Sequence, residues 1–389
     1  MRGWLLALWL AALPAWPQPA PVVVGAVVPE TGHLAELARG MRQALLLWQD
    51  ACNAAGGLLG RPVRLLLLDD RSEASAALVL YARLIEQERA DLLIGPFGSA
   101  ASVAAAAVAE RARRVLVNAT GVMPGVQRAD WRYVFQVPAP VTEYGAGALA
   151  LARAAGHARL QVVARNDAVS REAAESLAAQ AAASGMQATV QTASPGATDY
   201  GSHIAAARAR ATEAWIAFGR AEDAAEMVKA FKRARYAPPM FLAQGAAQEG
   251  FVRRVGQDAE FALGITAYEP GFATHGNAEF VARWRERWSG EPGLVAANAY
   301  SAALVLEAAV RAAGGLEQDR LRAALASLET ETPIGRYRVG EGGVQLGASP
   351  VVVQIQRGRA EIVWPRARAT AQLRLPYPRW EQRQVHAPQ

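Results

Sequence analysis

The chain has 389 residues, of which 52% are hydrophobic and 20% are charged. This length and balance suit two globular domains and exclude a disordered or fibrous protein. The formal net charge is +6, from 41 Lys and Arg against 35 Asp and Glu, and the two signs are mixed along the sequence. Mixed charge is typical of solvated helix faces, so we do not expect the chain to bind nucleic acid.

Residues 1–20 have the pattern of a secretory signal peptide. A positive charge at Arg2 precedes a short apolar run, Trp4–Leu13, and a Pro-rich stretch follows as far as Pro21. This order is typical of exported chains, and the apolar run is too short to cross a bilayer as a helix. We therefore expect a soluble mature protein in the periplasm. The alternative is an uncleaved membrane anchor, because the segment has no cleavage site of the usual small-residue type.

Apolar runs and helical segments alternate in the first third of the chain. Residues 22–28 form a nearly unbroken apolar run, which is typical of a strand buried on both faces of a parallel sheet. The pattern continues with a helix at 34–54 and strands at 63–68, 91–94 and 114–117. These strands run into small or polar residues that suit turns and helix starts, a layout typical of a ligand-binding crevice.

A second series of strands and helices begins near residue 145. The expected helices are 145–155, 171–183, 200–209 and 221–235, and the expected strands are 160–164, 188–192, 214–218, 240–243 and 262–268. The later segments are helices at 278–288 and 296–313 and strands at 351–356 and 362–364. Because right-handed crossovers place helices on both faces of a sheet, the alternation predicts an α/β fold with two doubly wound parallel sheets.

Several short segments, in this order and spacing, carry a family resemblance. They are Val24–Gly32, Asn53–Val63, Asp69–Asp70, Ile94–Pro96 and Pro195–Tyr200. The chain resembles the leucine-binding-protein-like group of periplasmic substrate-binding proteins, which are the extracytoplasmic receptors of ABC importers. The resemblance extends over most of the sequence.

The resemblance implies a type I periplasmic binding fold, in which two lobes are joined by a three-stranded hinge. We expect residues 21–139 plus 271–334 in the first lobe and residues 140–270 plus 335–389 in the second. The implied crossings between the lobes lie near 138–140, 268–271 and 332–337.

Candidate ligand contacts of the first lobe follow two strands. Open parallel sheets bind ligands at the carboxyl ends of their strands, where helix N-termini converge. Ser99 either caps the following helix or offers its hydroxyl to a ligand carboxylate, and Ala100 would add a backbone N–H. By resemblance, Asn118, Ala119 and Thr120 contact the same carboxylate. The alternative for Asn118 is a turn that tolerates Asn.

The second lobe departs from the amino-acid binders of the family. Those proteins place an acidic residue after the strand that here ends at Ala243, where this chain has Gln244 and then small residues. A ligand ammonium group would be left unpaired at considerable cost, unless Asp167 or Glu249 replaces the missing carboxylate. Arg220 either pairs with a second anionic group of the ligand or is an exposed arginine at a helix start.

Signatures of enzymes, metals and cofactors are missing from the sequence. The five histidines are dispersed without ligand spacing, and no dinucleotide, P-loop or nucleophile-elbow motif is found. Asp69 and Asp70 face opposite sides of their strand, so they are a poor acid–base pair. The single cysteine, Cys52, excludes an internal disulfide and is interpreted as a buried, inert thiol.

These observations predict a monomeric binding protein that is not an enzyme and has no cofactor. Its lobes would close over a small amino acid, carboxylate or amide and present the closed form to an ABC permease in the inner membrane. The alternative is a periplasmic ligand-sensing module that works with a separate signalling partner. An enzyme ranks third, because no catalytic group of residues is visible.

Overall fold

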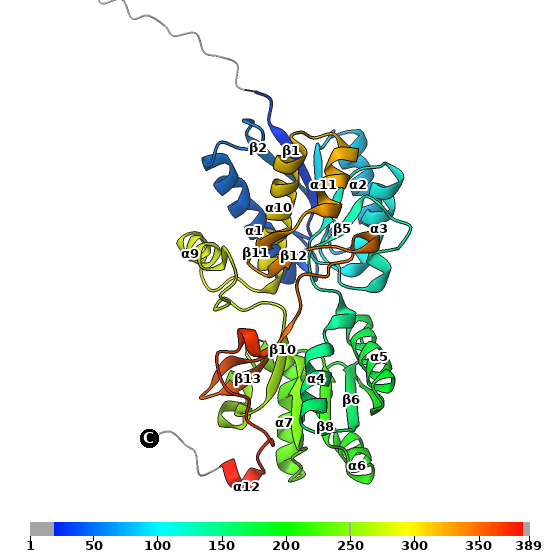
Figure 1. The fold of residues 1–389 in the computed structure, drawn as a ribbon, viewed down its shortest axis with the longest axis vertical. Helices are drawn as coiled ribbons and strands as arrows, with labels where there is room; N and C mark the ends of the chain where they lie inside the picture. The colour runs from blue at the N-terminus through cyan, green and yellow to red at the C-terminus, as the bar shows by residue number, and fades with distance from the viewer. Residues whose placement is uncertain (1–18, 249, 384–389) are drawn as a thin grey trace, which may run out of the picture.

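The computed structural model describes residues 19–248 and 250–383. It has two α/β lobes stacked along the long axis of the molecule (Figure 1). The predicted fold class is confirmed. The signal peptide expected at residues 1–20 falls almost entirely outside the described residues, and so does Glu249.

The first lobe is built on a five-stranded, wholly parallel sheet in the order β2-β1-β3-β4-β5. Alternate residues of the interior strand β1 point to opposite faces, so that Val22, Val24 and Ala26 join one core cluster and Val27 joins another. The strands are β1 (Val22–Val27), β2 (Val63–Leu68), β3 (Leu92–Ile94), β4 (Leu116–Asn118) and β5 (Val134–Gln136).

Helices cover both faces of this first sheet, as a doubly wound fold requires. One face carries α1 (Ala35–Ala54), α9 (Asn277–Arg287), α10 (Leu294–Ala313) and α11 (Gln318–Ser327). The other face carries α2 (Ala76–Glu86) and α3 (Ser99–Arg111). The chain therefore returns to the first lobe after it has built most of the second.

The helix α10 is apolar and long enough to cross a membrane, alone among the helices of residues 19–248 and 250–383. Its 18-residue apolar window is 67% buried inside the protein. It packs against α1 and α11, where Ala296 lies 3.4 Å from the position a Cβ would take on Gly40. We interpret α10 as a core helix of the first lobe.

The second lobe is built on a seven-stranded sheet in the order β14-β13-β10-β9-β8-β6-β7. Five strands are parallel, whereas β13 pairs antiparallel with both β10 and β14. The strands are β6 (Arg159–Arg165), β7 (Gln187–Ala193), β8 (Ala214–Phe218), β9 (Met240–Ala243), β10 (Leu263–Thr266), β13 (Val351–Gln356) and β14 (Arg359–Trp364). The expectation of a parallel sheet thus holds for this lobe except at its β13–β14 edge.

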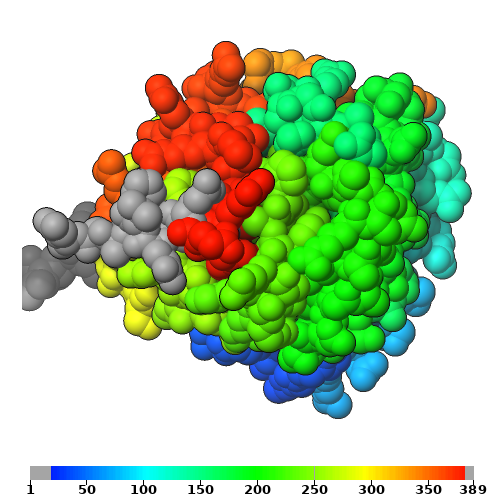
Figure 2. Space-filling model, turned by 90° about the horizontal axis from the view of Figure 1, so that it is seen from below, coloured from blue at the N-terminus to red at the C-terminus, as the bar shows by residue number. Residues whose placement is uncertain are grey.

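Helices also lie on both faces of the second sheet. One face carries α4 (Ala146–Ala154) and α5 (Ala168–Ala183). The other carries α6 (Gly201–Ala209), α7 (Ala221–Arg233) and α8 (Phe251–Val255). The C-terminal segment, with α12 (Trp380–Arg383), lies across the outer end of this lobe, where Tyr377 N donates to Pro239 O at 2.7 Å (Figure 2).

The third crossing between the lobes lies further along the chain than expected. The segment expected to cross, 332–337, instead belongs to a small antiparallel hairpin of β11 (Thr330–Thr332) and β12 (Gly335–Tyr337). Tyr337 is fully buried in the core of the first lobe, and Gln345 Nε2 donates to Val137 O at 2.9 Å. Residues 335–345 therefore pack with the first lobe, and the chain crosses between 345 and 351.

The crossing segments are not the strands that the family resemblance implied. None of the residues at 137–140, 267–272 and 346–350 lies in a β-strand. At the first crossing, Val141 N donates to Val122 O at 2.9 Å, which ties the second lobe to a loop of the first. Three irregular segments thus connect the lobes, and few backbone hydrogen bonds oppose bending there.

Candidate ligand-binding site between the lobes

The carboxyl ends of the parallel strands in both lobes point toward the junction. β1 starts at the outer end of the first lobe and runs toward the second (Figure 1). In the second lobe, the parallel register of β6, β8 and β9 brings the ends of these strands together at one edge of the sheet. Open α/β sheets bind ligands at this edge, so the candidate site lies between the two sets of loops.

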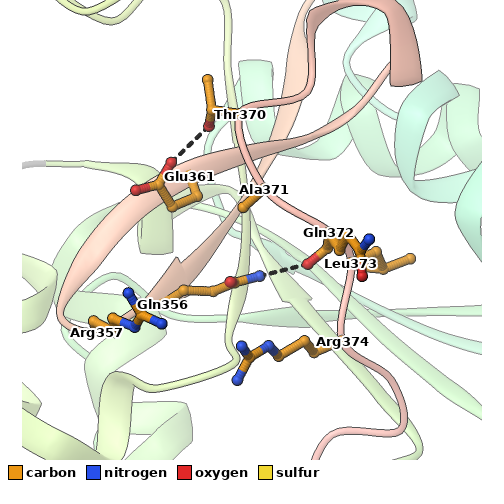
Figure 3. A pocket seen from close by; sticks show the side chains of 8 residues that line it. All are labelled: Gln356, Arg357, Glu361, Thr370, Ala371, Gln372, Leu373 and Arg374. Carbon is orange, nitrogen blue, oxygen red and sulfur yellow. Dashed lines mark hydrogen bonds between the residues drawn. The ribbon is translucent and has the colours of Figure 1, made fainter.

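A hollow of about 390 Å³ lies elsewhere, at the β13–β14 edge of the second sheet (Figure 3). Its walls are tied by hydrogen bonds from Gln356 Nε2 to Gln372 O (2.7 Å) and from Thr370 Oγ1 to Glu361 Oε2 (2.6 Å). Because β13 runs antiparallel to β10, its end at Gln356 faces away from the junction. We therefore do not assign the principal ligand to this hollow.

The helix α3 begins with unoccupied backbone N–H groups. Its N-cap residue is Gly98, with φ +86° and ψ 153°, so no side chain caps the helix. Ser99 is the first helical residue and not the N-cap; its Oγ accepts from Val122 N (3.1 Å) and Met123 N (3.4 Å), which leaves the hydroxyl proton free to donate. Ala100 is exposed beside it. An uncapped helix N-terminus with a free hydroxyl donor is suited to a carboxylate.

The polar side chains that follow β4 are engaged inside the first lobe. Asn118 is fully buried; its Oδ1 accepts from Gly121 N (2.9 Å) and its Nδ2 donates to Gly121 O (2.8 Å). Thr120 Oγ1 donates to Pro96 O (2.7 Å) and accepts from Gly98 N (2.8 Å). These bonds favour the turn interpretation of Asn118 and show that Thr120 holds the loop that presents Ser99.

Ala119, between these two residues, is fully buried in the core cluster of the first lobe. Its side chain therefore faces the core. A role for Ala119 in ligand binding stays a prediction that concerns its backbone only.

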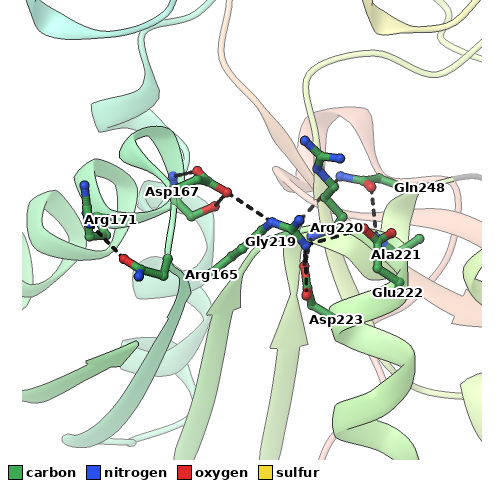
Figure 4. Close-up of polar contacts among 11 residues, drawn as sticks. Arg165, Asp167, Arg171, Gly219, Arg220, Ala221, Glu222, Asp223 and Gln248 are labelled. Carbon is green, nitrogen blue, oxygen red and sulfur yellow. Dashed lines mark hydrogen bonds and ion pairs between the residues drawn. The ribbon is translucent and has the colours of Figure 1, made fainter. Parts of the chain in front are cut away.

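Arg165, the last residue of β6, is the centre of an ionic cluster (Figure 4). The cluster lies at the edge of the second sheet formed by the carboxyl ends of its strands. The Arg165 guanidinium lies 3.0 Å from Asp223 Oδ2, 3.4 Å from Glu222 Oε1 and 3.4 Å from Asp167 Oδ2. One cation thus serves three carboxylates. The sequence interpretation missed Arg165, although a charge that closes an apolar strand is a recognisable signal.

Two of these carboxylates also cap helices. Asp167 Oδ1 accepts from Ser170 N (2.9 Å) at the start of α5, and Asp223 Oδ2 accepts from Arg220 N (2.8 Å) at the start of α7. The N-terminus of α5 is therefore capped by an acid of the protein, and at the N-terminus of α7 the N–H of Ala221 donates to Gln248 Oε1 at 3.0 Å. Unlike α3, they offer no open site for an anion.

Figure 4 shows the guanidinium of Arg220, in the loop after β8, pointing away from Asp223. The Arg220 side chain is exposed and makes no ion pair with any residue that the structure describes. Gln244 is half-buried at the start of a 3₁₀ turn, Gln244–Ala247, after β9. The structure thus brings Asp167, Arg220 and Gln244 to neighbouring strand ends of one sheet, β6, β8 and β9.

Glu269 is an acidic residue at this junction that the sequence interpretation missed. It follows β10 in the second crossing segment and is half-buried. Burial raises the pKa of Glu269 to about 7, and a hydrogen bond with Thr266 only partly opposes this shift. An acidic residue just past the end of an apolar strand was the signal that could have identified it.

The described residues hold no group of three or more His, Cys, Asp or Glu arranged to bind a metal ion. Within the described part of the chain, the site consists instead of hydrogen-bond donors, one ionic cluster and the guanidinium of Arg220, which has no ion pair there. Such a site is suited to holding a small polar molecule between two lobes.

Two α/β lobes with facing sets of strand-end loops are the architecture of the type I periplasmic binding fold. The chain belongs to the periplasmic binding protein family, whose sequence model it matches over residues 21–360. A curated relative, an amino acid binding protein from Pseudomonas aeruginosa, is 30% identical over 122 residues. That match spans 30% of this chain and 32% of the relative.

Solved structures share the fold at low sequence identity. A putative branched-chain amino acid ABC transporter protein from Silicibacter pomeroyi has a TM-score of 0.81 at 21% identity and covers 92% of this chain and 99% of its own. A solute-binding protein from Rhodopseudomonas palustris in complex with benzoate has a TM-score of 0.72 at 20% identity. The match covers 92% of this chain and 97% of the Rhodopseudomonas chain. A substrate-binding protein from Streptococcus pneumoniae in complex with isoleucine has a TM-score of 0.71 at 20% identity. The match covers 89% of this chain and 100% of the Streptococcus chain.

Proposed function

We propose that this chain is the extracytoplasmic substrate-binding protein of an ABC importer and that it captures a small amino acid or another small carboxylate. The observation that carries the proposal is the open N-terminus of α3. Gly98 leaves its N–H groups uncapped, and the Ser99 hydroxyl proton is free beside them. The names of its structural relatives include complexes with isoleucine, leucine and benzoate, all of which carry a carboxylate.

The binding mechanism follows from the two-lobed fold. The first lobe would hold the ligand carboxylate at α3, and the loops after β6, β8 and β9 would close over the rest of the molecule. A ligand stabilises the closed state only through contacts that it makes better there than in the open state. The three irregular crossings are the segments where the backbone would bend.

Export to the periplasm, a monomeric state and delivery to an inner-membrane permease complete the proposal. In this scheme the protein has no catalytic role, and the closed, loaded form is what the permease would recognise. Arg220 and Gln244 would contact the ligand from the second lobe. Asn118, Ala119 and Thr120 would support the carboxylate site from the first.

Ligand binding is tested by thermal shift with the mature chain against the common amino acids, aliphatic and aromatic carboxylates and amides. A ligand that binds only the folded protein raises the melting temperature by mass action. We expect at least one carboxylate to do so and to compact the protein in small-angle scattering. A panel without any stabilising carboxylate would contradict the proposal.

A further inference from the structure

The hollow at the β13–β14 edge of the second sheet is built apart from the junction between the lobes (Figure 3). Residues of β13 and β14 and the irregular segment 370–374 line it. Its volume of about 390 Å³ is within the range of small-molecule sites, about 300–1,000 Å³. Because all its lining residues belong to the second lobe, bending at the three crossings leaves the shape of this hollow unchanged.

Hydrogen bonds hold segment 370–374 against the two strands. The fully buried Gln354 of β13 accepts from Arg374 N (2.9 Å) and donates to Arg374 O (2.8 Å) through its side-chain amide. At the other end of the segment, Thr370 Oγ1 donates to Glu361 Oε2 at 2.6 Å. The protein's own bonds therefore fix the walls of the hollow, which lowers the entropic cost of binding a ligand there.

Two arginines face each other across the hollow. Arg357 directly follows β13 and Arg374 ends the segment opposite, and Figure 3 shows their side chains extending toward one another. Neither guanidinium has a hydrogen bond or an ion pair with any residue of 19–248 or 250–383. In contrast, the exposed Arg285 and Arg311 each bond a glutamate at 2.7 Å. Two converging cations repel each other, and an anion between them removes this cost.

The acids beside the hollow are bonded to other groups. Glu361 accepts the hydroxyl bond described above, and the two carboxylate oxygens of Glu260 accept from Arg357 N (2.6 Å) and Gly358 N (3.2 Å). Neither carboxylate forms an ion pair within the described part of the chain. The charge of this region is also one-sided, since residues 351–378 contain five arginines and one glutamate. Most of the chain's net charge of +6 therefore lies here.

We propose that this hollow is a second binding site, and that it takes a phosphate dianion, either as inorganic phosphate or as a small phosphate monoester. Each guanidinium presents a fork of N–H donors that matches two phosphate oxygens, and a tetrahedral dianion has enough oxygens for both forks. A monocarboxylate has one charge and two oxygens, which a single arginine already satisfies. The hollow is therefore selective for doubly charged oxyanions, and its ligand differs in class from the carboxylate proposed for the junction.

The two sites act independently. The open N-terminus of α3, the anion site proposed at the junction, belongs to the first lobe, whereas the hollow belongs to the second. A ligand at the junction should therefore leave the affinity for phosphate unchanged.

The charge of the ligand gives the second site its pH dependence. The second ionisation of a phosphate monoester has a pKa of about 6. Lowering the pH from 8 to 5 converts the dianion to the monoanion and should weaken binding, while both arginines stay charged.

The experiment is isothermal titration of wild type, Arg357→Gln and Arg374→Gln with inorganic phosphate and with glycerol 3-phosphate, at pH 8 and low salt. The control is Arg366→Gln, at an exposed arginine of the 3₁₀ turn Arg366–Arg368 that does not line the hollow. It removes the same charge from the same region. We expect each lining variant to weaken binding by about tenfold or more and the control to weaken it by less than about threefold.

Two further measurements complete the experiment. Arg374→Lys keeps the charge and loses the fork, so it should also weaken binding. Melting temperatures of all variants should match wild type, because the substituted side chains are exposed. The tighter of the two ligands shows whether the phosphate group is free or esterified.

Three results would overturn the inference. The first is a wild type that binds neither phosphate ligand at millimolar concentration. The second is a control variant that loses as much affinity as the lining variants, which would indicate diffuse attraction to a basic surface. The third is displacement of phosphate by a carboxylate that binds at the junction, which would place the phosphate at α3. None of these results bears on the proposed function, which is tested with carboxylates at the junction.

Discussion

Arg165 Nη1 lies 3.0 Å from Asp223 Oδ2, and the two side chains are only 13% and 5% exposed. This pair links the end of β6 to the first turn of α7 and so fixes the loops that face the junction. Because Asp223 also accepts from Arg220 N, loss of the cation would disturb the start of the helix as well. The pair belongs to the scaffold that supports the site.

Removal of Arg165 should therefore destabilise the second lobe. Arg165→Met leaves the buried Asp223 carboxylate without its cation, which typically costs about 3–5 kcal/mol. Urea unfolding measures the loss. Arg171→Met, at an exposed arginine that only bonds Asn166, is the control and should cost less than about 0.5 kcal/mol. Equal stability of the two variants would contradict a structural role for the pair.

Glu269 should make stability depend on pH. Its pKa is raised from 4.5 to about 7 on folding, so the folded state holds the proton more tightly than the unfolded state. The resulting stabilisation is fully present below about pH 4.5 and is lost as pH rises through 7. Glu269→Gln should thus gain stability relative to wild type between pH 5 and pH 8, by about 1 kcal/mol or more. If the melting temperatures of wild type and Glu269→Gln differ by the same amount at every pH in this range, the raised pKa of Glu269 is contradicted.

Ser99→Ala should weaken ligand binding much more than it weakens the fold. The variant removes the hydroxyl that would donate to a ligand carboxylate, and a lost hydrogen bond to a charged group costs about 1.5–3 kcal/mol, or roughly tenfold to a hundredfold in affinity. The control is Ser102→Ala one turn later, whose buried hydroxyl donates to Gly98 O at 2.8 Å. Titration calorimetry should show weaker binding for Ser99→Ala, whereas an equal loss in both variants would indicate a general effect on α3.

Gly245 allows the loops after β8 and β9 to approach each other closely. A Cβ on Gly245 would lie 2.0 Å from Arg220 O, so Gly245→Ala must push the Arg220 loop away. We expect a loss of stability of about 1–3 kcal/mol, together with weaker ligand binding. Gly315→Ala, in the first lobe and outside the crossing segments, meets no atom within 4 Å and serves as the control in the same melting and binding assays. Unchanged ligand binding by Gly245→Ala would show that the Arg220 loop is not part of the ligand-binding site.

The sequence predicted most of the regular elements because their signals are local. The apolar run of β1 and the helix after it have nearly the bounds expected, since unbroken apolar strands and periodic helices leave few alternatives. The third crossing was misplaced for the opposite reason. The burial of Tyr337 and the bond from Gln345 to Val137 depend on partners far away in the chain.

The same contrast applies to the candidate site. Ser99 and Arg220 were predicted as candidates because strand ends and helix starts can be located from the sequence. Arg165 and Glu269 were missed, although each is a charged residue at or just past the end of an apolar strand; only the folded chain shows which of these charges have partners. Asn118 and Thr120 were identified as polar, but their hydrogen bonds inside the first lobe could not be read from residue type.

By itself, the sequence determined the α/β class, the two series of strands and the small, polar ends of those strands. These features follow from side-chain period and turn chemistry, which act over a few residues. Tertiary structure alone decided that α3 starts uncapped, that Arg165 neutralises three acids and that Glu269 has no ion pair with the residues of 19–248 and 250–383. Charge pairing and burial depend on distances between segments far apart in the chain, and only folding sets those distances.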